Sequence, residues 1–257
     1  MSPRPYILAE ANWKTIKEVK YEVAVLPWGA TEAHNYHLPY CTDVIQCDFI
    51  ASEAGRIAWE TGAKVMIMPT IPFGVQTGQL DIPFCLNINP STQLLILKDL
   101  VHSLLVQGIR KLVLLNGHGG NDFRQMIREL QGFFPDMFIA EINWFKVVTR
   151  ANYFDAPGDH ADEMETSAML HIAPHLVLPL SEAGDGSTNK NKLKAIQEGW
   201  AWTPRQWTKA TNDTGAGNPY KATAEKGAKH LGDTITKIAS FLTDVAQTDT
   251  ANLYEHN

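Results

Sequence analysis

The chain has 257 residues, of which 44% are hydrophobic and 19% charged, and its formal net charge is −6. This composition excludes a disordered chain, and the length allows one large hydrophobic core. A mildly acidic chain has no general attraction for nucleic acid or anionic membranes, and no apolar run is long enough to predict a transmembrane helix. We therefore expect a globular protein whose partners include neither nucleic acid nor a membrane.

The N-terminal segment and the cysteines favour a cytoplasmic location. Residues 1–14 carry charge and proline where a signal peptide needs an apolar stretch. Cys41, Cys47 and Cys85 form an odd, sparse set without zinc-binding spacing, which argues against a disulfide scaffold. We expect all three to be structural.

Short apolar runs alternate with helical patterns over the first 142 residues. The predicted strands cover residues 22–26, 63–69, 111–115 and 137–142. The predicted helices cover residues 43–60, 91–107 and 121–133. Apolar strands that are each followed by a helix favour a mostly parallel sheet covered on both faces, which is a three-layer α/β/α sandwich.

The pattern is weaker after Trp144. A helix is predicted at 162–171 and a last one at 220–246, whereas residues 184–219 are rich in Gly, Asn, Thr and Trp and are expected to be irregular. Since the sequence shows neither an internal repeat nor a linker, we predict a single domain over residues 1–257.

Polar clusters follow three of the predicted strands, where sites in such sheets usually lie. Glu32 and His34 follow the first strand, and residues two apart in an extended segment point the same way. Asp43 opens the next helix and could return to the same edge. Two carboxylates and an imidazole suit a divalent metal such as zinc or manganese. The alternative is that Asp43 caps its helix, since residues 43–46 fit a capping box.

The second cluster is Asn-Gly-His-Gly-Gly-Asn at residues 116–121, between a strand and a helix. Its glycines permit a tight turn with free N–H groups, which would also suit a phosphate-binding loop. The dinucleotide and phosphate-loop patterns both fail, however, because a third glycine and a lysine are missing. His118 could therefore be a metal ligand presented by a sharp bend, with Asn116 and Asn121 holding the loop by hydrogen bonds.

The third cluster contains His160 just before a helix and Glu165 one turn into it, so both side chains could face one cavity. The alternative is again capping, because Asp162 and Glu165 fit a capping box. His37 could orient a ligand or hold its loop. The other histidines have no partner cluster and are expected to be structural: His102, His171, His175, His230 and His256.

Together these motifs resemble the creatininase (creatinine amidohydrolase) family. The matching segments are LPWGATEAHNYHLP at 26–39, Thr-Asp at 42–43, NGHGGN at 116–121 and HADEMETS at 160–167. The resemblance implies the three-layer α/β fold and a two-metal site. By position, Glu32, Asp43 and His118 would hold one ion, and His34 and Asp43 the other, with Asp43 bridging the pair.

The chain departs from the family pattern at three places. Creatinine-hydrolysing members carry a glutamate ligand where this chain has Gly120, and Glu165 is expected to replace it. The family usually has Gly-Pro in place of Asn35 and Tyr36, and often a histidine and a PGT segment where this chain has residues 73–84. The last two departures lie where substrate would be contacted, so the substrate stays open.

The expected function is metal-dependent hydrolysis of a non-peptide C–N bond in a small amide or lactam. A hydroxide bridging two divalent ions would attack the carbonyl carbon, since metal charge lowers the pKa of water. His160 is the candidate proton donor to the leaving nitrogen, and Glu165 either binds metal or transfers a proton. The resemblance also implies a homo-oligomer, and hexamers are common in the family.

Two other functions stay open. A family relative could act on a formamide or on a peptide bond, and a metal-free α/β protein could bind a phosphate or nucleotide through residues 116–121. Four tryptophans could form aromatic walls for a flat substrate, although packing or subunit contact is the usual role of this side chain. These are Trp144, Trp200, Trp202 and Trp207.

Overall fold

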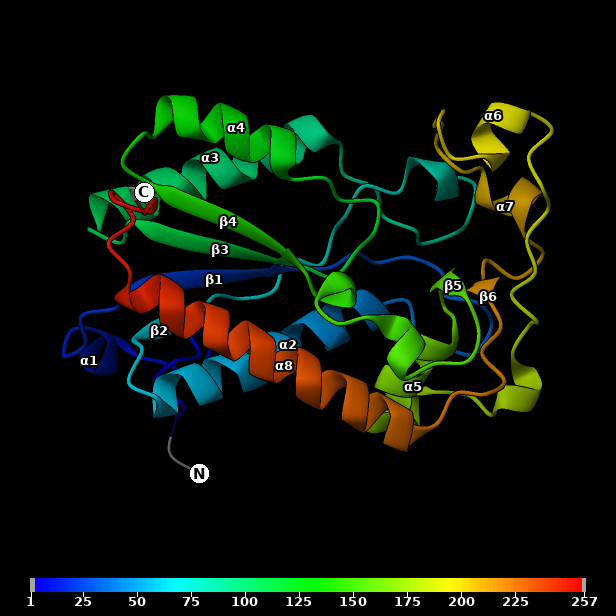
Figure 1. Ribbon diagram of the computed structural model, residues 1–257, viewed down its shortest axis with the longest axis horizontal. Helices are drawn as coiled ribbons and strands as arrows, with labels where there is room; N and C mark the ends of the chain where they lie inside the picture. The colour runs from blue at the N-terminus through cyan, green and yellow to red at the C-terminus, as the bar shows by residue number, and fades with distance from the viewer. Residues whose placement is uncertain (1–2, 256–257) are drawn as a thin grey trace.

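The computed structural model describes residues 3–255, so His256 lies outside the described residues. Its centre is a four-stranded parallel sheet with the strand order β2-β1-β3-β4. The strands are β1 (Val23–Trp28), β2 (Val65–Ile67), β3 (Lys111–Asn116) and β4 (Phe138–Asn143). Because all four are parallel, their carboxyl ends meet at one edge of the sheet (Figure 1).

Helices cover both faces of the sheet, as the sequence predicts (Figure 1). The helices α2 (Thr42–Glu60), α5 (Glu163–Ile172) and α8 (Ala224–Gln247) pack on one face. The helices α3 (Pro90–Val106) and α4 (Arg124–Phe133) pack on the other. Each face has its own apolar core, so the three-layer α/β/α sandwich is confirmed.

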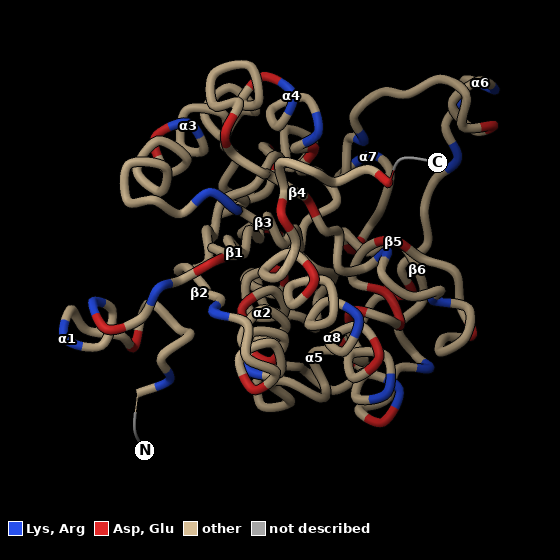
Figure 2. The backbone as a smooth tube through the Cα atoms, turned by 60° about the vertical axis from the view of Figure 1, so that its left-hand side comes forward, with Lys and Arg blue, Asp and Glu red and all other residues tan. Residues whose placement is uncertain are grey.

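A small antiparallel pair, β5 (Gly158–His160) and β6 (Ala216–Gly217), lies beside the main sheet. Residues 188–211, here called the arm, project from the body between these two strands, with α6 standing clear of it in two views (Figures 1 and 2). Lysines and arginines alternate with acidic residues around the outside (Figure 2). The remaining elements are short: α1 (Trp13–Ile16), η1 (Thr77–Gln79), η2 (Trp144–Lys146), η3 (Arg150–Asn152), η4 (Pro174–Leu176), η5 (Leu180–Glu182), α6 (Lys194–Gln197) and α7 (Trp207–Ala210).

Three predicted elements differ from the structure at their ends. The helix predicted at 121–133 begins only at Arg124, because residues 116–121 are held in a turn by their own side chains. The strand predicted at 63–69 is only three residues long. The last helix begins at Ala224 rather than 220, after Thr223, whose hydroxyl caps it by accepting from the Lys226 N–H. Residues 158–160, expected to be a loop, form β5, which has no apolar run to reveal it.

Among residues 3–255, no helix combines the length and the apolar character that crossing a bilayer requires. The three cysteines are free, and Cys47 and Cys85 are buried.

Gly29 brings the end of β1 directly against the first turn of α2. A Cβ atom placed at Gly29 would lie 2.8 Å from the backbone nitrogen of Val44 and 2.9 Å from the carbonyl carbon of Asp43. Protein interiors are too densely packed to absorb such a contact without a backbone shift. Only glycine therefore allows Asp43 to lie so close to the edge of the sheet.

We predict that Gly29→Ala lowers the free energy of unfolding by about 1–3 kcal/mol, because an added methyl group overpacks this contact. The matched control is Gly132→Ala on α4, where an added Cβ meets no atom within 4 Å. It should stabilise the protein by up to about 1 kcal/mol, since alanine is the better helix former. Urea denaturation measures both changes. Equal effects of the two substitutions would contradict the packing argument.

His230 on α8 is buried without a polar partner. Its ring lies against the rings of Trp144, Tyr153 and Phe154, and neither ring nitrogen has a hydrogen-bond partner among the described residues. Burial, helped by the nearby Arg150 charge, lowers the pKa of His230 to about 4. The ring is therefore neutral in the folded protein at neutral pH.

His230 should make the folded state sensitive to acid. An unfolded histidine takes up its proton near pH 6.5, whereas the folded one resists until about pH 4. The contribution of the neutral His230 ring to the free energy of unfolding is thus fully present above about pH 6.5. It falls by ~3 kcal/mol as the pH falls towards 4. In His230→Phe the fall in unfolding free energy over this range should be smaller than in the wild type. The exposed His102→Phe is the control, and identical pH profiles for wild type and His230→Phe would contradict the assignment.

Candidate metal centre

Six polar side chains from two loops, one strand end and two helix starts converge at the carboxyl edge of the sheet. Every one of them is buried, with at most 8% of its surface exposed, although acids and histidines usually lie at the surface. They are Glu32 and His34 after β1, Asp43 on α2, His118 after β3, His160 at the end of β5 and Glu165 in the first turn of α5.

Asp43 lies at the centre of the cluster. One of its oxygens lies 2.9 Å from Nε2 of His34, and the other lies 3.1 Å from Nδ1 of His118. The N-cap residue of α2 is Cys41, which makes no capping hydrogen bond with its side chain. The capping interpretation of Asp43 is therefore wrong, because its carboxylate faces two imidazoles.

Glu32 contacts the same ring nitrogen of His118 as Asp43 does. Its Oε1 atom lies 2.8 Å from Nδ1 of His118 and 3.8 Å from Nδ1 of His160. Its Oε2 atom accepts a hydrogen bond of 2.6 Å from Nε2 of Gln79. Glu32 thus presents one oxygen to the cluster and keeps the other in a hydrogen bond.

Glu165 joins the cluster from the first turn of α5. Its Oε2 lies 4.0 Å from Nε2 of His34 and accepts a hydrogen bond from the backbone of Ala161. Asp162 is the N-cap of the helix and accepts from the N–H groups of Met164 and Glu165. The capping interpretation is therefore confirmed for Asp162, while the Glu165 carboxylate extends towards His34.

Each of the three histidines uses one ring nitrogen to bond a backbone carbonyl. His34 Nδ1 lies 3.1 Å from the Glu32 carbonyl, His118 Nε2 lies 2.9 Å from that of Val75, and His160 Nε2 lies 2.8 Å from that of Ala33. Since a carbonyl only accepts, these nitrogens must carry the protons. The other nitrogen of each neutral ring then points a lone pair at the carboxylates, which is how histidines that bind metals are normally held.

Three overlapping groups in the cluster could hold a metal ion, and in each, one donor atom per residue lies within 4.8 Å of the others. Two of them share Asp43: one is Glu32, Asp43 and His118, and the other is His34, Asp43 and Glu165. The third is Glu32, His34 and His160, which overlaps both. Oε1 of Glu32 and Oδ2 of Asp43 are buried without any hydrogen bond among the described residues. Buried carboxylate oxygens of this kind need a cation, so the residues present fit a pair of divalent ions.

The charges of the cluster also require a compensating cation. Burial opposes protonation of His34, but the Asp43 carboxylate outweighs it and raises the pKa of His34 to about 10. Burial raises the pKa of Glu165 to about 8. The pKa of Asp43 is lowered despite burial, because His34 and His118 face its carboxylate. Without an ion, protons must therefore compensate the buried carboxylates.

The loop of residues 116–121 is held as predicted. The side-chain amide of Asn116 donates to the His118 carbonyl at 3.0 Å, and that of Asn121 donates to the Asn116 side chain at 3.0 Å. A Cβ atom at Gly120 would lie 2.1 Å from the Val75 carbonyl oxygen and 2.5 Å from Nε2 of His118. No glutamate can occupy this position in the present backbone. The carboxylate ligand that the family places here therefore has to come from another segment of the chain.

His37 and the tryptophans take different positions. His37 lies outside the cluster, with Nε2 2.8 Å from the hydroxyl of Thr166 on α5. Trp207 packs against His160 with ring centroids 4.6 Å apart and the rings tilted by 53°, whereas Trp200 and Trp202 are exposed on the arm and Trp144 is buried in the core. Only Trp207 of the four could therefore meet a substrate at the cluster.

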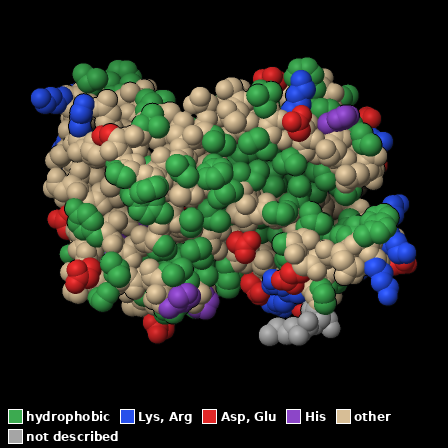
Figure 3. Space-filling model, turned by 180° about the vertical axis from the view of Figure 1, so that it is seen from behind, with side chains coloured by type: hydrophobic (Ala, Val, Ile, Leu, Met, Phe, Trp, Pro, Cys, Tyr) green, Lys and Arg blue, Asp and Glu red, His purple; other side chains and the backbone are tan. Residues whose placement is uncertain are grey.

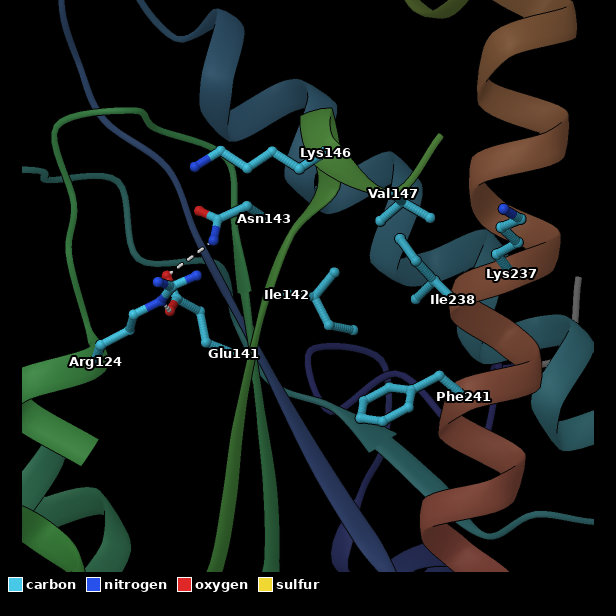
Figure 4. Close-up of a pocket in the computed structure, with 9 residues that line it drawn as sticks. All are labelled: Arg124, Glu141, Ile142, Asn143, Lys146, Val147, Lys237, Ile238 and Phe241. Atoms are coloured by element: carbon cyan, nitrogen blue, oxygen red, sulfur yellow. Dashed lines mark hydrogen bonds and ion pairs between the residues drawn. The ribbon is translucent and has the colours of Figure 1, made fainter. Parts of the chain in front are cut away.

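Two cavities lie outside the cluster itself. The first, of about 350 Å³, lies between β4 and α8, and Figure 4 shows Ile142, Val147, Ile238 and Phe241 forming its apolar side. No cluster residue lines it, so it is separate from the chemistry. The second, of about 210 Å³, is lined by the chain neighbours of Gln79 and Trp207, at residues 77–81 and 206–209.

Fold and site together define an α/β protein with a buried carboxylate–imidazole centre suited to two cations. The model of the creatininase family, described as creatinine amidohydrolase, matches residues 9–242. The chain belongs to the creatininase family and is a hydrolase of that type.

Curated relatives are similar at moderate identity. A mycofactocin precursor peptide peptidase of Mycobacterium ulcerans (strain Agy99) is 28% identical over 84% of each chain. A creatinine amidohydrolase of Pseudomonas putida is 28% identical over 60% of this chain and 66% of its own. These relatives support the family while differing in the substrates that their names give.

Solved structures show the same fold. A candidate creatinine amidohydrolase of Bacteroides fragilis NCTC 9343 has 48% identity and a TM-score of 0.92, over 98% of this chain and 99% of its own. A structure described as the manganese form of creatininase has 22% identity and a TM-score of 0.78, over 95% of this chain and 100% of its own. The fold assignment therefore holds over almost the whole chain.

Sequence reasoning missed Gln79, which bonds Glu32 from the loop after β2. It gave Trp207 only as one of four possible aromatic walls and did not predict its contact with His160. Neither residue shares a sequence motif with a cluster residue, and only the tertiary fold brings the two residues to the cluster.

We predict that Asp43→Ala binds neither divalent ion, because the two ligand groups that share Asp43 both lose a carboxylate. Elemental analysis of purified protein should fall from about two ions per chain to nearly none. Asp48→Ala is the control, since Asp48 is an exposed acid on the same helix. Full metal occupancy in Asp43→Ala would refute the shared centre.

Proposed function

We propose that this protein is a metal-dependent amidohydrolase that cleaves a non-peptide C–N bond in a small amide or lactam. Glu32, Asp43 and His118 hold one divalent ion, and His34, Asp43 and Glu165 hold the other, with zinc or manganese as the fitting metals. The observation that supports this most is the Asp43 carboxylate, which is shared by two histidines while its own Oδ2 atom and Oε1 of Glu32 are buried without a hydrogen bond.

The bound ions supply a nucleophile from water near neutral pH and polarise the carbonyl oxygen of the substrate. The protein's part is to hold the ligands in fixed orientations before substrate arrives. The carbonyl groups of Glu32, Val75 and Ala33 fix the three imidazole rings. Burial keeps bulk water away, which strengthens every charge interaction at the centre.

His160 is the proposed proton donor to the leaving nitrogen. Its Nδ1 faces the cluster, and burial together with His34 lowers its pKa. A lowered pKa favours release of a proton once the ring has been charged, as a general acid requires. Trp207 packs against the ring, and the Ala33 carbonyl accepts from its Nε2, so the ring is held in place on two sides.

The position of the arm favours a small substrate. Trp207 of the arm lies against His160, and the Arg205 carbonyl of the arm lies against Gly78, so the arm covers part of the cluster. An extended peptide would need the arm to move. We therefore favour a small amide or lactam over the peptide substrate that the name of the mycobacterial relative gives.

Hydrophobic surface supports a homo-oligomer, with a hexamer as the family would suggest. Exposed aromatic and aliphatic side chains are frequent in residues 73–86, and hydrophobic side chains gather across the middle of the face seen from behind (Figure 3). Patches of this kind are typical of subunit contacts. We also propose a cytoplasmic location, since the cysteines are free.

The reaction is tested with the metal-loaded protein on a panel of lactams including creatinine, N-formyl compounds, linear amides and short peptides. We expect turnover of one or more of the small cyclic or linear amides, and at most slow cleavage of peptides, because the arm covers part of the cluster through Trp207. Product formation by mass spectrometry ranks the substrates. Preferential cleavage of peptides would overturn the proposed substrate class.

We predict that His160→Ala retains both ions but turns over the best panel substrate 10²–10⁴-fold more slowly, on the order expected for a lost general acid. The control is His175→Ala, because His175 is an exposed histidine in η4, just after α5. Metal content and kcat are measured on the same preparations. Unchanged kcat would remove His160 from the reaction, and lost metal would make it a ligand instead.

A further inference from the structure

Gln79 is fully buried and bonded at both ends of its side chain. Nε2 donates to Oε2 of Glu32 at 2.6 Å, and Oε1 accepts from the thiol of Cys85 at 3.1 Å. The Cys85 sulfur itself accepts from the backbone N–H of Ala33 at 3.2 Å. A chain of three hydrogen bonds therefore runs from the backbone beside Glu32 back to the Glu32 carboxylate.

The direction of this chain follows from the chemistry of its ends. An ionised carboxylate only accepts hydrogen bonds, so the amide NH₂ group of Gln79 must face Glu32. A reversed amide would place its oxygen against the carboxylate and leave a buried acceptor without a donor. The Cys85 thiol then supplies the donor for the amide oxygen, which keeps the amide in this orientation.

The bond to Gln79 decides which oxygen of Glu32 is free. Oε2 is occupied by the amide, whereas Oε1 has no hydrogen bond and lies 2.8 Å from Nδ1 of His118. Only Oε1 is therefore directed at the position where Asp43 and His118 also converge. A carboxylate held in this way offers a cation one oxygen rather than two.

We propose that Gln79 is a positioning residue that fixes Oε1 of Glu32 for single-oxygen coordination of the ion shared with Asp43 and His118, and that Cys85 holds Gln79 in place. This inference rests on the proposed two-ion centre. Groups that hydrogen-bond a metal ligand orient it and tune its affinity for the ion.

The backbone around Gln79 is built to hold it still. Gln79 closes the turn η1, and its N–H donates to the Gln76 carbonyl at 2.9 Å. A Cβ atom at Gly78 would lie 1.8 Å from the Arg205 carbonyl oxygen, so the arm packs directly on this turn. The N–H of Gln76 donates in turn to the side chain of Asn87 at 2.8 Å.

The test is the stepwise affinity for Zn²⁺, measured by competition with a chelator, in the full-length wild type and in Gln79→Met. Methionine keeps the length of the side chain and removes the donor. We expect one of the two binding steps to weaken by about 10–100-fold, the usual effect of losing such a partner. The other step, through His34, Asp43 and Glu165, should change by less than about threefold.

Gln76→Met is the matched control, because Gln76 is a buried glutamine of the same turn that bonds the Thr31 carbonyl instead of a ligand. It should leave both affinities unchanged. Cys85→Ala should weaken the same step as Gln79→Met, and Cys85→Ser should restore part of the loss, since a hydroxyl can still donate. If Gln79→Met does not fold, Gln79→Leu removes the donor without adding a charge.

Unchanged affinities in Gln79→Met would overturn the inference while leaving the two-ion centre intact. Equal weakening by Gln76→Met would also overturn it, since the turn as a whole would then be responsible. If the wild type itself bound no divalent ion, the proposed function would fail, and the inference with it.

Discussion

The structure depends on the compensation of three buried carboxylates at one edge of a parallel sheet. Glu32, Asp43 and Glu165 lie so close together that their charges cannot all persist without cations or protons among them. Three imidazoles face them, but each spends one N–H on a backbone carbonyl and offers the cluster a lone pair. A pair of divalent ions satisfies both sets of groups, which neither water nor a single proton can do.

The fold provides this arrangement by close backbone contacts at the edge of the sheet. Gly29 lets the start of α2 approach β1, so that Asp43 lies between the loops after β1 and β3. Gly117 allows a similar contact, because a Cβ atom there would lie 2.4 Å from the sulfur of Cys47. At Gly120 the backbone is so close to Val75 that a ligand is excluded, and Glu165 from α5 extends towards His34 instead.

Much of this could be predicted from the sequence, for definite reasons. Apolar strands alternating with helices gave the parallel sheet, and the motif resemblance gave the family and the five ligand candidates that the fold brings together. Spacing alone left capping open at Asp43, because a helix start and a metal site use the same residue types; only the contacts to His34 and His118 separate them.

The parts that could not be predicted depend on contacts between distant segments. Gln79 reaches Glu32 across 47 positions of the chain, and a buried glutamine in a loop has no distinctive neighbours in sequence. Trp207 lies in a segment without periodicity, so the sequence could not show that Trp207 packs against His160 while Trp200 is exposed. β5 and β6 are too short for an alternating pattern and form only by pairing with each other.

The most direct measurement of the central claim is anomalous X-ray diffraction from crystals of the protein loaded with zinc or manganese. Two peaks should appear roughly 3.5–4 Å apart on either side of the Asp43 carboxylate, the spacing typical of two-metal sites. One should lie beside Glu32 and His118, and the other beside His34 and Glu165. A single peak, or peaks remote from Asp43, would contradict the shared two-ion centre.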